Sequence, residues 1–347
     1  MRRDVWVKHL ETGLARPPSR IRPESAFGRP NSFRAVIQST ATARVRAIPD
    51  HHTMKKMMMN YKYLGIPLVV LALASCGGGG GDDSTASGSG STSSPTAAAA
   101  QANGAKTFPS TCYSNKSPGN SNNTFGSFTV SSNIWNPGAA TAYNQCTSAT
   151  IQSPGGVTAA EFDWNFTSTS GSVLTYPNLQ FGQQNSYNAS TTSILPAPIS
   201  ALPSLTATGA ITTTCATAAP CYYDSGFDIF FSSGAHSSPT TQGELMIITS
   251  YNFAQPLGGW AATNVSIGGA TYNIRQFTMG SGSSSWPYVA YYATTPITQM
   301  NLNLNSFVAD AVSRGYIPSS YYLDMVEIGT EVLSGQGVTK ISNFNVQ

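Results

Sequence analysis

Short runs of β-branched and aromatic residues, separated by clusters of Gly, Pro, Asn and Ser, recur along the C-terminal two thirds of the chain. Runs bounded by turn-forming residues are typical of strands, and many of them in succession indicate a β-sandwich or jelly roll. The sequence therefore predicts an all-β domain with strands at 126–132, 159–167, 172–181, 226–232, 244–251, 270–279, 288–294, 321–333 and 338–346.

One segment, residues 302–316, has a different period. Its apolar side chains recur at the three- and four-residue spacing of a helix. They are Leu304, Phe307, Val308, Ala311 and Val312. Asn305 or Ser306 could cap the start of this helix, and Gly315 follows its end. We expect one helix packed on the sandwich.

The N-terminal part of the chain shows neither pattern. Residues 1–53 are Arg-rich and unpatterned, and we interpret them as a non-structural extension or a mis-assigned upstream stretch, with translation starting at Met54 or at 57–59. In residues 54–76, basic residues precede the short apolar run LGIPLVVLALA, which suits a signal peptide and is too short to span a bilayer.

This apolar run ends in Leu-Ala-Ser-Cys at Cys76, which is similar to a bacterial lipobox. The similarity implies cleavage before Cys76, lipidation of that residue and export to the outer membrane, the cell surface or the extracellular space. An ordinary signal peptide with a chance cysteine is the alternative. Residues 77–107 are rich in Gly, Ser and Ala and are expected to form a flexible linker, which leaves 108–347 as the folded domain.

The charge distribution argues against nucleic acid as a partner. After Cys76 the chain carries 5 basic against 11 acidic side chains, a formal net charge of −6. An acidic domain gains no binding energy from neutralising phosphates. The low charge and the many Ser, Thr, Asn and Gly residues suit an exported protein with an uncharged, hydroxyl-rich ligand.

Once Cys76 is lipidated, four cysteines remain, and an even number in an oxidising compartment suggests disulfides. Pairing nearest neighbours gives Cys112–Cys146 and Cys215–Cys221. No C-x-x-C pair occurs, and His236 is the only histidine after the signal, so we expect no metal site and no cofactor.

Two strand segments carry acids among apolar neighbours. Strict alternation places Glu244 and Met246 on one face and Leu245 and Ile247 on the other. In DMVEIGTEVL, the same rule places Glu331 on the face opposite the apolar Val and Ile side chains. Both glutamates could be plain surface acids, but an apolar strand with an acid on its concave face is typical of a cleft enzyme.

A pair of carboxylates suits glycoside hydrolysis, which needs a proton donor and either a nucleophile or a base, and no metal. A Ser-His-Asp triad would depend on His236, which lies in a polar loop, and Cys-His chemistry would use a cysteine of a disulfide.

Segments spread over the whole domain resemble motifs of glycoside hydrolase family 12, the jelly-roll endoglucanases and xyloglucanases. In chain order they are Ser132-Asn133-Ile134-Trp135-Asn136, Asp163-Trp164-Asn165-Phe166, Thr175-Tyr176-Pro177-Asn178, Phe227-Asp228-Ile229-Phe230, Glu244-Leu245-Met246-Ile247 and Gly329-Thr330-Glu331-Val332-Leu333-Ser334-Gly335. The resemblance implies two antiparallel sheets with a concave substrate cleft, and retaining endo-hydrolysis of a β-1,4-glucan.

The resemblance also implies roles for three acids. Glu244 matches the nucleophile, and Glu331 matches the acid/base, with the two carboxyl groups about 5–5.5 Å apart. Asp228 matches the acid beside the nucleophile, where a hydrogen bond between the two requires a shared proton or a raised pKa of Asp228.

Further positions match the binding cleft. Trp135 matches an aromatic that stacks on glucose, and Asn133, Met246 and Pro256 match cleft-lining positions. Trp286 and Tyr288 could add further sugar platforms. Glu327, on the face of Glu331, is either an acid that helps Glu331 hold its proton or a solvated acid at the cleft rim.

The chain departs from the family pattern at Ile248 and Phe166, which stand where the family has tryptophans, and at Leu333, where it usually has phenylalanine. The loss of a cleft tryptophan at position 248 could make room for a branched chain such as xyloglucan. We expect the domain to be a monomer. Two other functions are alternatives to hydrolysis: a glucan-binding lipoprotein on an inactive scaffold and, less well supported, an adhesin.

Overall fold

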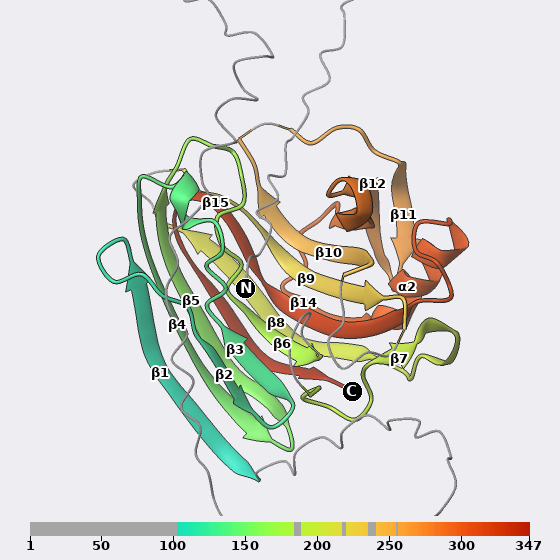
Figure 1. Cartoon of the computed structure of the whole chain (residues 1–347), viewed down its shortest axis with the longest axis horizontal. Helices are drawn as coiled ribbons and strands as arrows, with labels where there is room; N and C mark the ends of the chain where they lie inside the picture. Colours follow the sequence, from blue (N-terminus) through green and yellow to red (C-terminus); the bar gives the residue numbers. More distant parts are fainter. Residues whose placement is uncertain (1–102, 184–188, 217–219, 235–240, 255) are drawn as a thin grey trace, which may run out of the picture. The chain divides into compact units, whose positions relative to one another are not determined.

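The structure is a computed structural model, and it describes residues 103–183, 189–216, 220–234, 241–254 and 256–347 (Figure 1). The expected extension, the signal peptide with Cys76, nearly all of the linker and His236 lie outside the described residues. The first strand begins at Gly104, slightly before the expected domain start at 108. Within the described part, no helix is long and apolar enough to cross a membrane.

Strands make up most of the described chain, as predicted. Their bounds are β1 (Gly104–Ser114), β2 (Asn122–Phe125), β3 (Phe128–Ser131), β4 (Ala142–Ser153), β5 (Gly156–Thr167), β6 (Asn178–Gly182), β7 (Ala197–Pro198), β8 (Thr206–Cys215), β9 (Tyr222–Ser232), β10 (Gly243–Asn252), β11 (Ala262–Ile267), β12 (Ala270–Met279), β13 (Trp286–Ala293), β14 (Gln299–Asn303) and β15 (Tyr322–Val346). Short 3-10 turns lie at Pro137–Ala139, Ile199–Ala201 and Gly282–Ser284.

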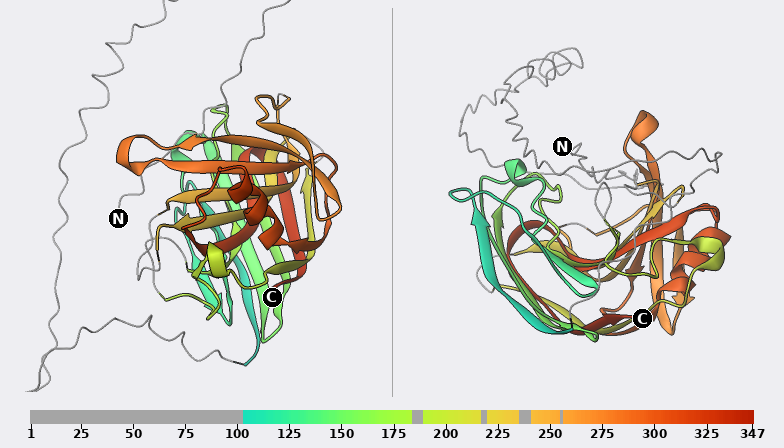
Figure 2. Two further views of the ribbon diagram at one scale, coloured as in Figure 1. Left: turned by 90° about the vertical axis from the view of Figure 1, so that its right-hand side faces the viewer. Right: turned by 60° about the horizontal axis from the view of Figure 1, so that its bottom comes forward.

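The strands form two curved, packed sheets, which confirms the sandwich (Figure 2). Sheet A has the order β1-β4-β5-β15-β8-β14. Sheet B has the order β2-β3-β6-β15-β9-β10-β13-β12-β11. One pairing departs from the expected antiparallel arrangement, because β13 runs parallel to β10.

Strand β15 belongs to both sheets. Its first half pairs with β6 and β9, and its second half pairs with β5 and β8. The runs predicted as separate strands, 321–333 and 338–346, are therefore one 25-residue strand. The strand crosses from sheet B to sheet A at Gly335. Its φ of 92° and its close approach to Cys221 leave no room for a side chain.

The main hydrophobic core lies between the sheets. Leu245 and Ile247 of β10 point into it, as do Val326 and Ile328 of β15, and all four are at most 1% exposed. Full burial of one such side chain is worth about 1.5–3 kcal/mol. Their fixed orientation leaves the acids between them on the opposite face of sheet B, as the alternation predicted.

The predicted helix is present as α2 (Leu304–Ser313), followed by Gly315 with a φ of 73°. It packs through Phe307 against Tyr272 and Tyr291, with ring centroids 5.2 and 5.4 Å away. The predicted caps are wrong. The N-cap is Asn303, which makes no side-chain capping bond. Asn305 does not cap the helix, because its side chain bonds the backbone at Pro203 and Leu205.

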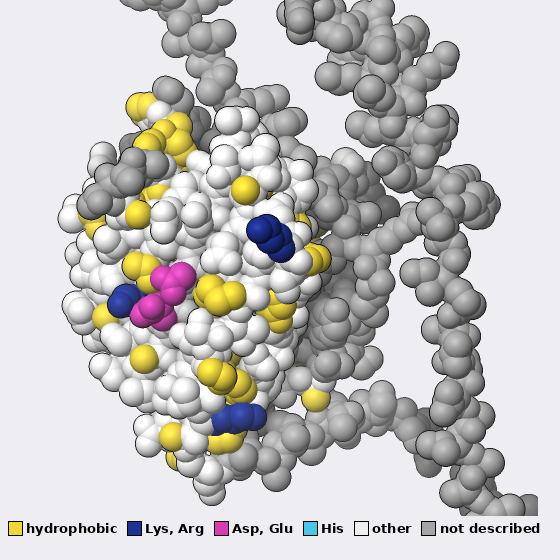
Figure 3. All heavy atoms as spheres, turned by 90° about the vertical axis from the view of Figure 1, so that its left-hand side faces the viewer, with side chains coloured by type: hydrophobic (Ala, Val, Ile, Leu, Met, Phe, Trp, Pro, Cys, Tyr) yellow, Lys and Arg dark blue, Asp and Glu magenta, His cyan; other side chains and the backbone are white. Residues whose placement is uncertain are grey.

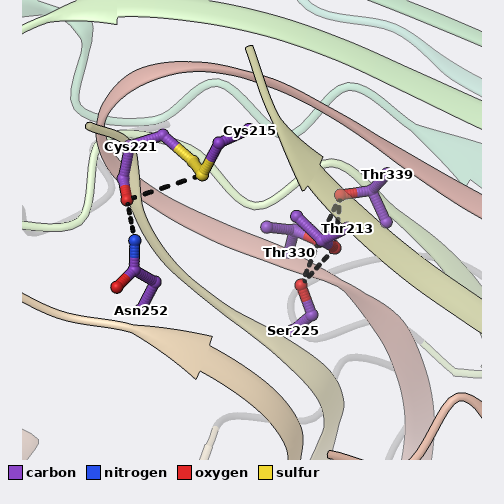
Figure 4. Close-up of a disulfide and its surroundings, with 7 residues drawn as sticks. All are labelled: Thr213, Cys215, Cys221, Ser225, Asn252, Thr330 and Thr339. Atoms are coloured by element: carbon purple, nitrogen blue, oxygen red, sulfur yellow. Dashed lines mark hydrogen bonds between the residues drawn. A yellow bond between two sulfur atoms is a disulfide. The ribbon is translucent and has the colours of Figure 1, made fainter. Parts of the chain in front are cut away.

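Both predicted disulfides are confirmed. Cys112 and Cys146 lie directly opposite each other on β1 and β4. Cys215 and Cys221 join the end of β8 to the start of β9, and Asn252 donates to the Cys221 carbonyl (Figure 4). The surface in Figure 3 is largely uncharged, with few acidic and basic side chains, in keeping with the composition.

Candidate active site

Five carboxylates lie on the face of sheet B that points away from sheet A. They are Asp224 and Asp228 on β9, Glu244 on β10, and Glu327 and Glu331 on β15. Each is 3–6% exposed. We call this group the carboxylate cluster. All three acids predicted to take part in catalysis belong to it.

Strand register fixes the layout of the cluster. Asp228 lies directly across from Met246 on one side and from Glu327 on the other, whereas Glu331 lies across from Asp224. Because β9 runs between β10 and β15, the backbones of these two strands are about 9–10 Å apart. Glu244 lies across from Phe230 and Glu331 across from Asp224, so the two glutamates flank β9 on either side of Asp228 along the strand.

Two buried phenols report the electrostatics of the cluster. The pKa of Tyr288 is raised well above 10.0 mainly by burial, and Tyr292, Glu331 and Glu244 add to the rise. The pKa of Tyr176 is raised by burial and then by Asp228, Glu327 and Glu331. Since Glu244 and Glu331 both act on Tyr288, their charges share one environment.

Both phenols therefore stay protonated and act as donors. Tyr288 donates to the Met246 sulfur at 3.1 Å, and Tyr176 donates to the Gly226 carbonyl at 3.0 Å. Met246 is 1% exposed beneath this contact, so it forms part of the floor of the site. Sequence reasoning considered Tyr288 only as a sugar platform and gave no role to Tyr176, although Tyr176 lies in one of the matched motifs.

Glu244 accepts a hydrogen bond from the indole of Trp286, with Nε1 2.9 Å from Oε2. Trp286 begins β13 and is half-buried. The sequence predicted a sugar platform at this position. Contact with the proposed nucleophile was not foreseen, because it depends on the parallel pairing of β10 with β13.

Glu327 is a buried member of the cluster, 3% exposed, so the alternative of a solvated rim acid is wrong. Asn178, fully buried on β6, donates to its Oε2 at 2.8 Å. The buried amide holds Glu327 within the sheet. Asn178 also lies in a matched motif, and sequence reasoning missed its role.

The other predicted binding residues lie in or near loops. Trp135 is half-buried just after β3, next to Asn133, which has a left-handed φ of 39°. Ile134 between them pairs with Thr175, which in turn pairs with Val332 and so holds this loop beside the middle of β15. Pro256 is exposed outside the strands. Their contact with a sugar stays a prediction.

The side chains at the two positions that lack family tryptophans are both buried. Phe166 is fully buried and stacks on Tyr143 at 5.3 Å between centroids, so its change affects core packing rather than a cleft. Ile248 is also fully buried, in an apolar cluster that includes Tyr292. Neither position offers exposed space.

Aromatic side chains from other positions surround Tyr292. We call Tyr251, Phe253, Trp260 and Tyr292 the aromatic cluster. Each of the first three has its ring centroid 5.4–6.4 Å from that of Tyr292. Tyr251 stacks on Phe253 and is 39% exposed, which leaves an aromatic face open near the end of β10.

Behind Glu331, buried hydroxyls link the two sheets (Figure 4). Thr330, the neighbour of Glu331, lies 2.7 Å from both Ser225 on β9 and Thr339 on the second half of β15. Thr213 on β8 joins the same network at 2.7–2.9 Å from Ser225 and Thr339. The network ties the backbone at Glu331 to both sheets.

Among the described residues, no group of three or more His, Cys, Asp or Glu side chains is arranged to hold a metal ion.

Residues 126–347 match the sequence pattern of glycosyl hydrolase family 12 over most of the domain. The chain belongs to this family. The match spans β3 to β15 and includes every member of the carboxylate cluster. The protein is therefore a glycoside hydrolase, and its predicted jelly-roll fold is that of the family.

Relatives differ in what their names say of activity. An endoglucanase S of Pectobacterium parmentieri is 27% identical over 53% of this chain and 70% of its own. A probable xyloglucan-specific endo-β-1,4-glucanase of Aspergillus flavus is 27% identical over 61% of this chain and 80% of its own. An inactive glycoside hydrolase of Phytophthora nicotianae is 28% identical over 60% and 81%.

A solved structure shows the same fold. The family 12 xyloglucanase of Bacillus licheniformis superposes with a TM-score of 0.58 over 68% of this chain and 99% of its own, at 22% identity.

Proposed function

We propose that this family 12 hydrolase is a retaining endo-β-1,4-glucanase that uses Glu244 as nucleophile and Glu331 as acid/base. The observation that carries the proposal is the burial of both glutamates on one face of sheet B, with Asp228 on the strand between them. Two carboxyl groups placed in this way supply what double displacement requires.

In the first step a Glu244 oxygen attacks the anomeric carbon while the bond to the leaving sugar breaks, and Glu331 gives its proton to the leaving oxygen. In the second step Glu331 takes a proton from water, the water oxygen bonds to the anomeric carbon, and the electron pair of the ester bond returns to Glu244. Asp228 shares a proton near the nucleophile, because neighbouring carboxylates cannot both ionise cheaply.

The substrate we propose is an uncharged β-1,4-glucan chain of the cellulose, mixed-linkage or xyloglucan type. Trp135 and the exposed Tyr251 would offer flat apolar faces to pyranose rings. The names of the endoglucanase and xyloglucanase relatives support this class. The buried Ile248 gives no added room for branches, so the preference between linear and branched chains is left to assay.

A second candidate is a non-catalytic glucan-binding protein, which the inactive relative favours. The carboxylate cluster speaks against it, because burying five acids together is costly and a binding surface gains nothing from it. In either case we propose export and anchoring through Cys76, on the lipobox-like sequence, with the domain acting as a monomer.

The test is reducing-sugar release from barley β-glucan, carboxymethylcellulose and xyloglucan by the wild type, Glu244→Gln and Glu331→Gln. Activity that falls by at least about a thousandfold in both variants supports the hydrolase. Wild-type binding to glucan without any release supports the binding protein instead.

A further inference from the structure

The contact between Trp286 and Glu244 carries an inference that rests on the proposed function. We propose that Trp286 is a positioning residue for the nucleophile: its indole N–H fixes the orientation of the Glu244 carboxylate and favours the charged form. This role replaces that of a sugar platform, which the sequence suggested for the same residue.

Register makes the contact a consequence of the fold. Glu244 lies directly across from Tyr288 on the parallel strand β13, and Trp286 lies two residues earlier on β13. Side chains two residues apart share a face, so Trp286 and Tyr288 both lie beside Glu244. From the start of β13, the indole then donates the 2.9 Å bond to Oε2.

The hairpin before Trp286 holds the indole in place. Trp286 on β13 pairs with Met279 on β12, and both side chains pack in the apolar cluster around Met246. Gly280 has a φ of 75°, and a side chain there would collide with the Ser284 carbonyl, so the chain turns tightly within a few residues. A donor held by such a turn needs no reorganisation when the reaction begins.

The bond changes strength as charge moves. A hydrogen bond to an ionised acceptor is stronger than one to a neutral acceptor, so the indole stabilises free Glu244 more than the glycosyl ester. The electron pair returns to the carboxylate in the second step, which the donor therefore assists. Without the donor, hydrolysis of the intermediate should slow more than its formation.

Other titratable groups face Glu244 from the neighbouring strands. Asp224 and Asp228 on β9 and Glu327 and Glu331 on β15 are acids that disfavour its charge. Tyr288 on β13 is a neutral phenol, and Arg275 on β12 is a cation on the same face. The indole is thus a fixed donor that opposes the acids. Its removal should move the acid limb of the pH profile of kcat/KM to higher pH.

The experiment compares Trp286→Phe with Trp164→Phe in the full chain. Both lose an indole and keep an aromatic ring, but Trp164 is a buried core residue that packs with Tyr223 and Val332, whose side chains point to the face of sheet B opposite the carboxylate cluster. On 2,4-dinitrophenyl β-cellobioside, Trp286→Phe should lower kcat about 10- to 100-fold, the loss expected for one bond to a charged group. KM should fall with kcat, because the intermediate accumulates.

Trp164→Phe should leave the acid limb, kcat and KM unchanged. A sugar-platform role predicts a different pattern for Trp286→Phe, in which KM rises while kcat and the acid limb do not change. That result would refute the positioning role. If Glu244→Gln is inactive but Trp286→Phe shows none of the expected effects, only the role of Trp286 is refuted. Full activity in Glu244→Gln would remove the proposed function as well.

If Trp286→Phe does not fold, the wild type supplies the answer. The indole ¹H–¹⁵N resonance of Trp286 should shift with pH along the acid limb of activity, and this titration should vanish in Glu244→Gln. A resonance that ignores pH in the wild type contradicts the proposal.

Discussion

Asp324 makes the stability of the domain depend on pH in a direction that is unusual for an acid. Its side chain is fully buried on β15, and burial raises its pKa from 3.8 to about 7, a rise that the bond to Ser232 only partly offsets. The Ser232 hydroxyl lies 2.8 Å from both Asp324 Oδ1 and the Gly234 carbonyl. One hydroxyl hydrogen cannot serve both acceptors. A protonated Asp324 resolves the conflict by donating to Ser232, which then donates to Gly234.

The sign follows from proton binding. Below about pH 4 the acid is protonated in both the folded and unfolded states, so it costs nothing. Between about pH 4 and pH 7 only the folded state keeps the proton, and the free energy of unfolding falls by about 1.4 kcal/mol per pH unit from this group. Above pH 7 the cost levels off at about 4 kcal/mol, because a tenfold change in acid strength is worth about 1.4 kcal/mol.

Asp324→Asn keeps the shape and removes the charge, and its amide can donate to Ser232. Urea unfolding of the oxidised chain from pH 4 to pH 9 should give equal stabilities at pH 4 and a more stable variant at pH 8, by up to about 4 kcal/mol. The difference between the two proteins cancels the other buried acids. A difference that does not change with pH, or a variant that is less stable at pH 8, would refute the protonated Asp324.

Three further predictions concern binding and stability. Tyr251→Ala should raise KM for long glucan chains about 3- to 10-fold and leave hydrolysis of a short aryl cellobioside unchanged, because it removes the open face of the aromatic cluster; equal effects on both substrates would contradict this. Replacing Cys112 and Cys146 by Ser should cost about 4 kcal/mol of unfolding free energy, against about 2 kcal/mol for Cys215 and Cys221, because the closed loops span 34 and 6 residues; urea titrations that reverse this order would argue against it. Thr330→Val should lower the free energy of unfolding by about 1–3 kcal/mol, because Ser225 and Thr339 lose a buried partner; an unchanged urea midpoint would show that the hydroxyl network contributes nothing.

The sequence predicted best where side chains alternate between a core and a site. The faces of Glu244 and Leu245 on β10 follow from the pattern alone, and so do those of Glu327 and Ile328 on β15. The apolar stripe of α2 was equally clear. In each case burial on one side selects one period, and a slip of one residue would expose the whole set.

The strands that sequence reasoning missed are polar. Strand β1 is mostly exposed, and β8 reads TATGAITTTC, in which threonine takes the place of the large apolar residues that mark a strand. Their order in the sheet comes from pairing with β4 and β15 rather than from their own composition. Local pattern cannot reveal a strand whose stability comes from its neighbours.

Sequence reasoning predicted the acids of the site but missed the residues that hydrogen-bond to them. Glu244 and Glu331 stand out as charges among apolar residues, whereas Asn178 and Trp286 gain their meaning only from the pairings of β6 with β15 and of β10 with β13. Ile248 looked like a cleft position, but its side chain is fully buried. Contacts of this kind depend on sheet topology, which no single strand encodes.

The central claim is that Glu244 attacks the sugar and forms a covalent intermediate. The most direct measurement is mass spectrometry of the full chain after incubation with 2,4-dinitrophenyl 2-deoxy-2-fluoro-β-cellobioside, because the fluorine slows breakdown of such an intermediate. The account predicts one fluorocellobiosyl group, on the peptide that contains Glu244, and none in Glu244→Gln. A chain that hydrolyses glucan without forming this adduct, or that carries it on Asp224 or Glu327, would contradict the account.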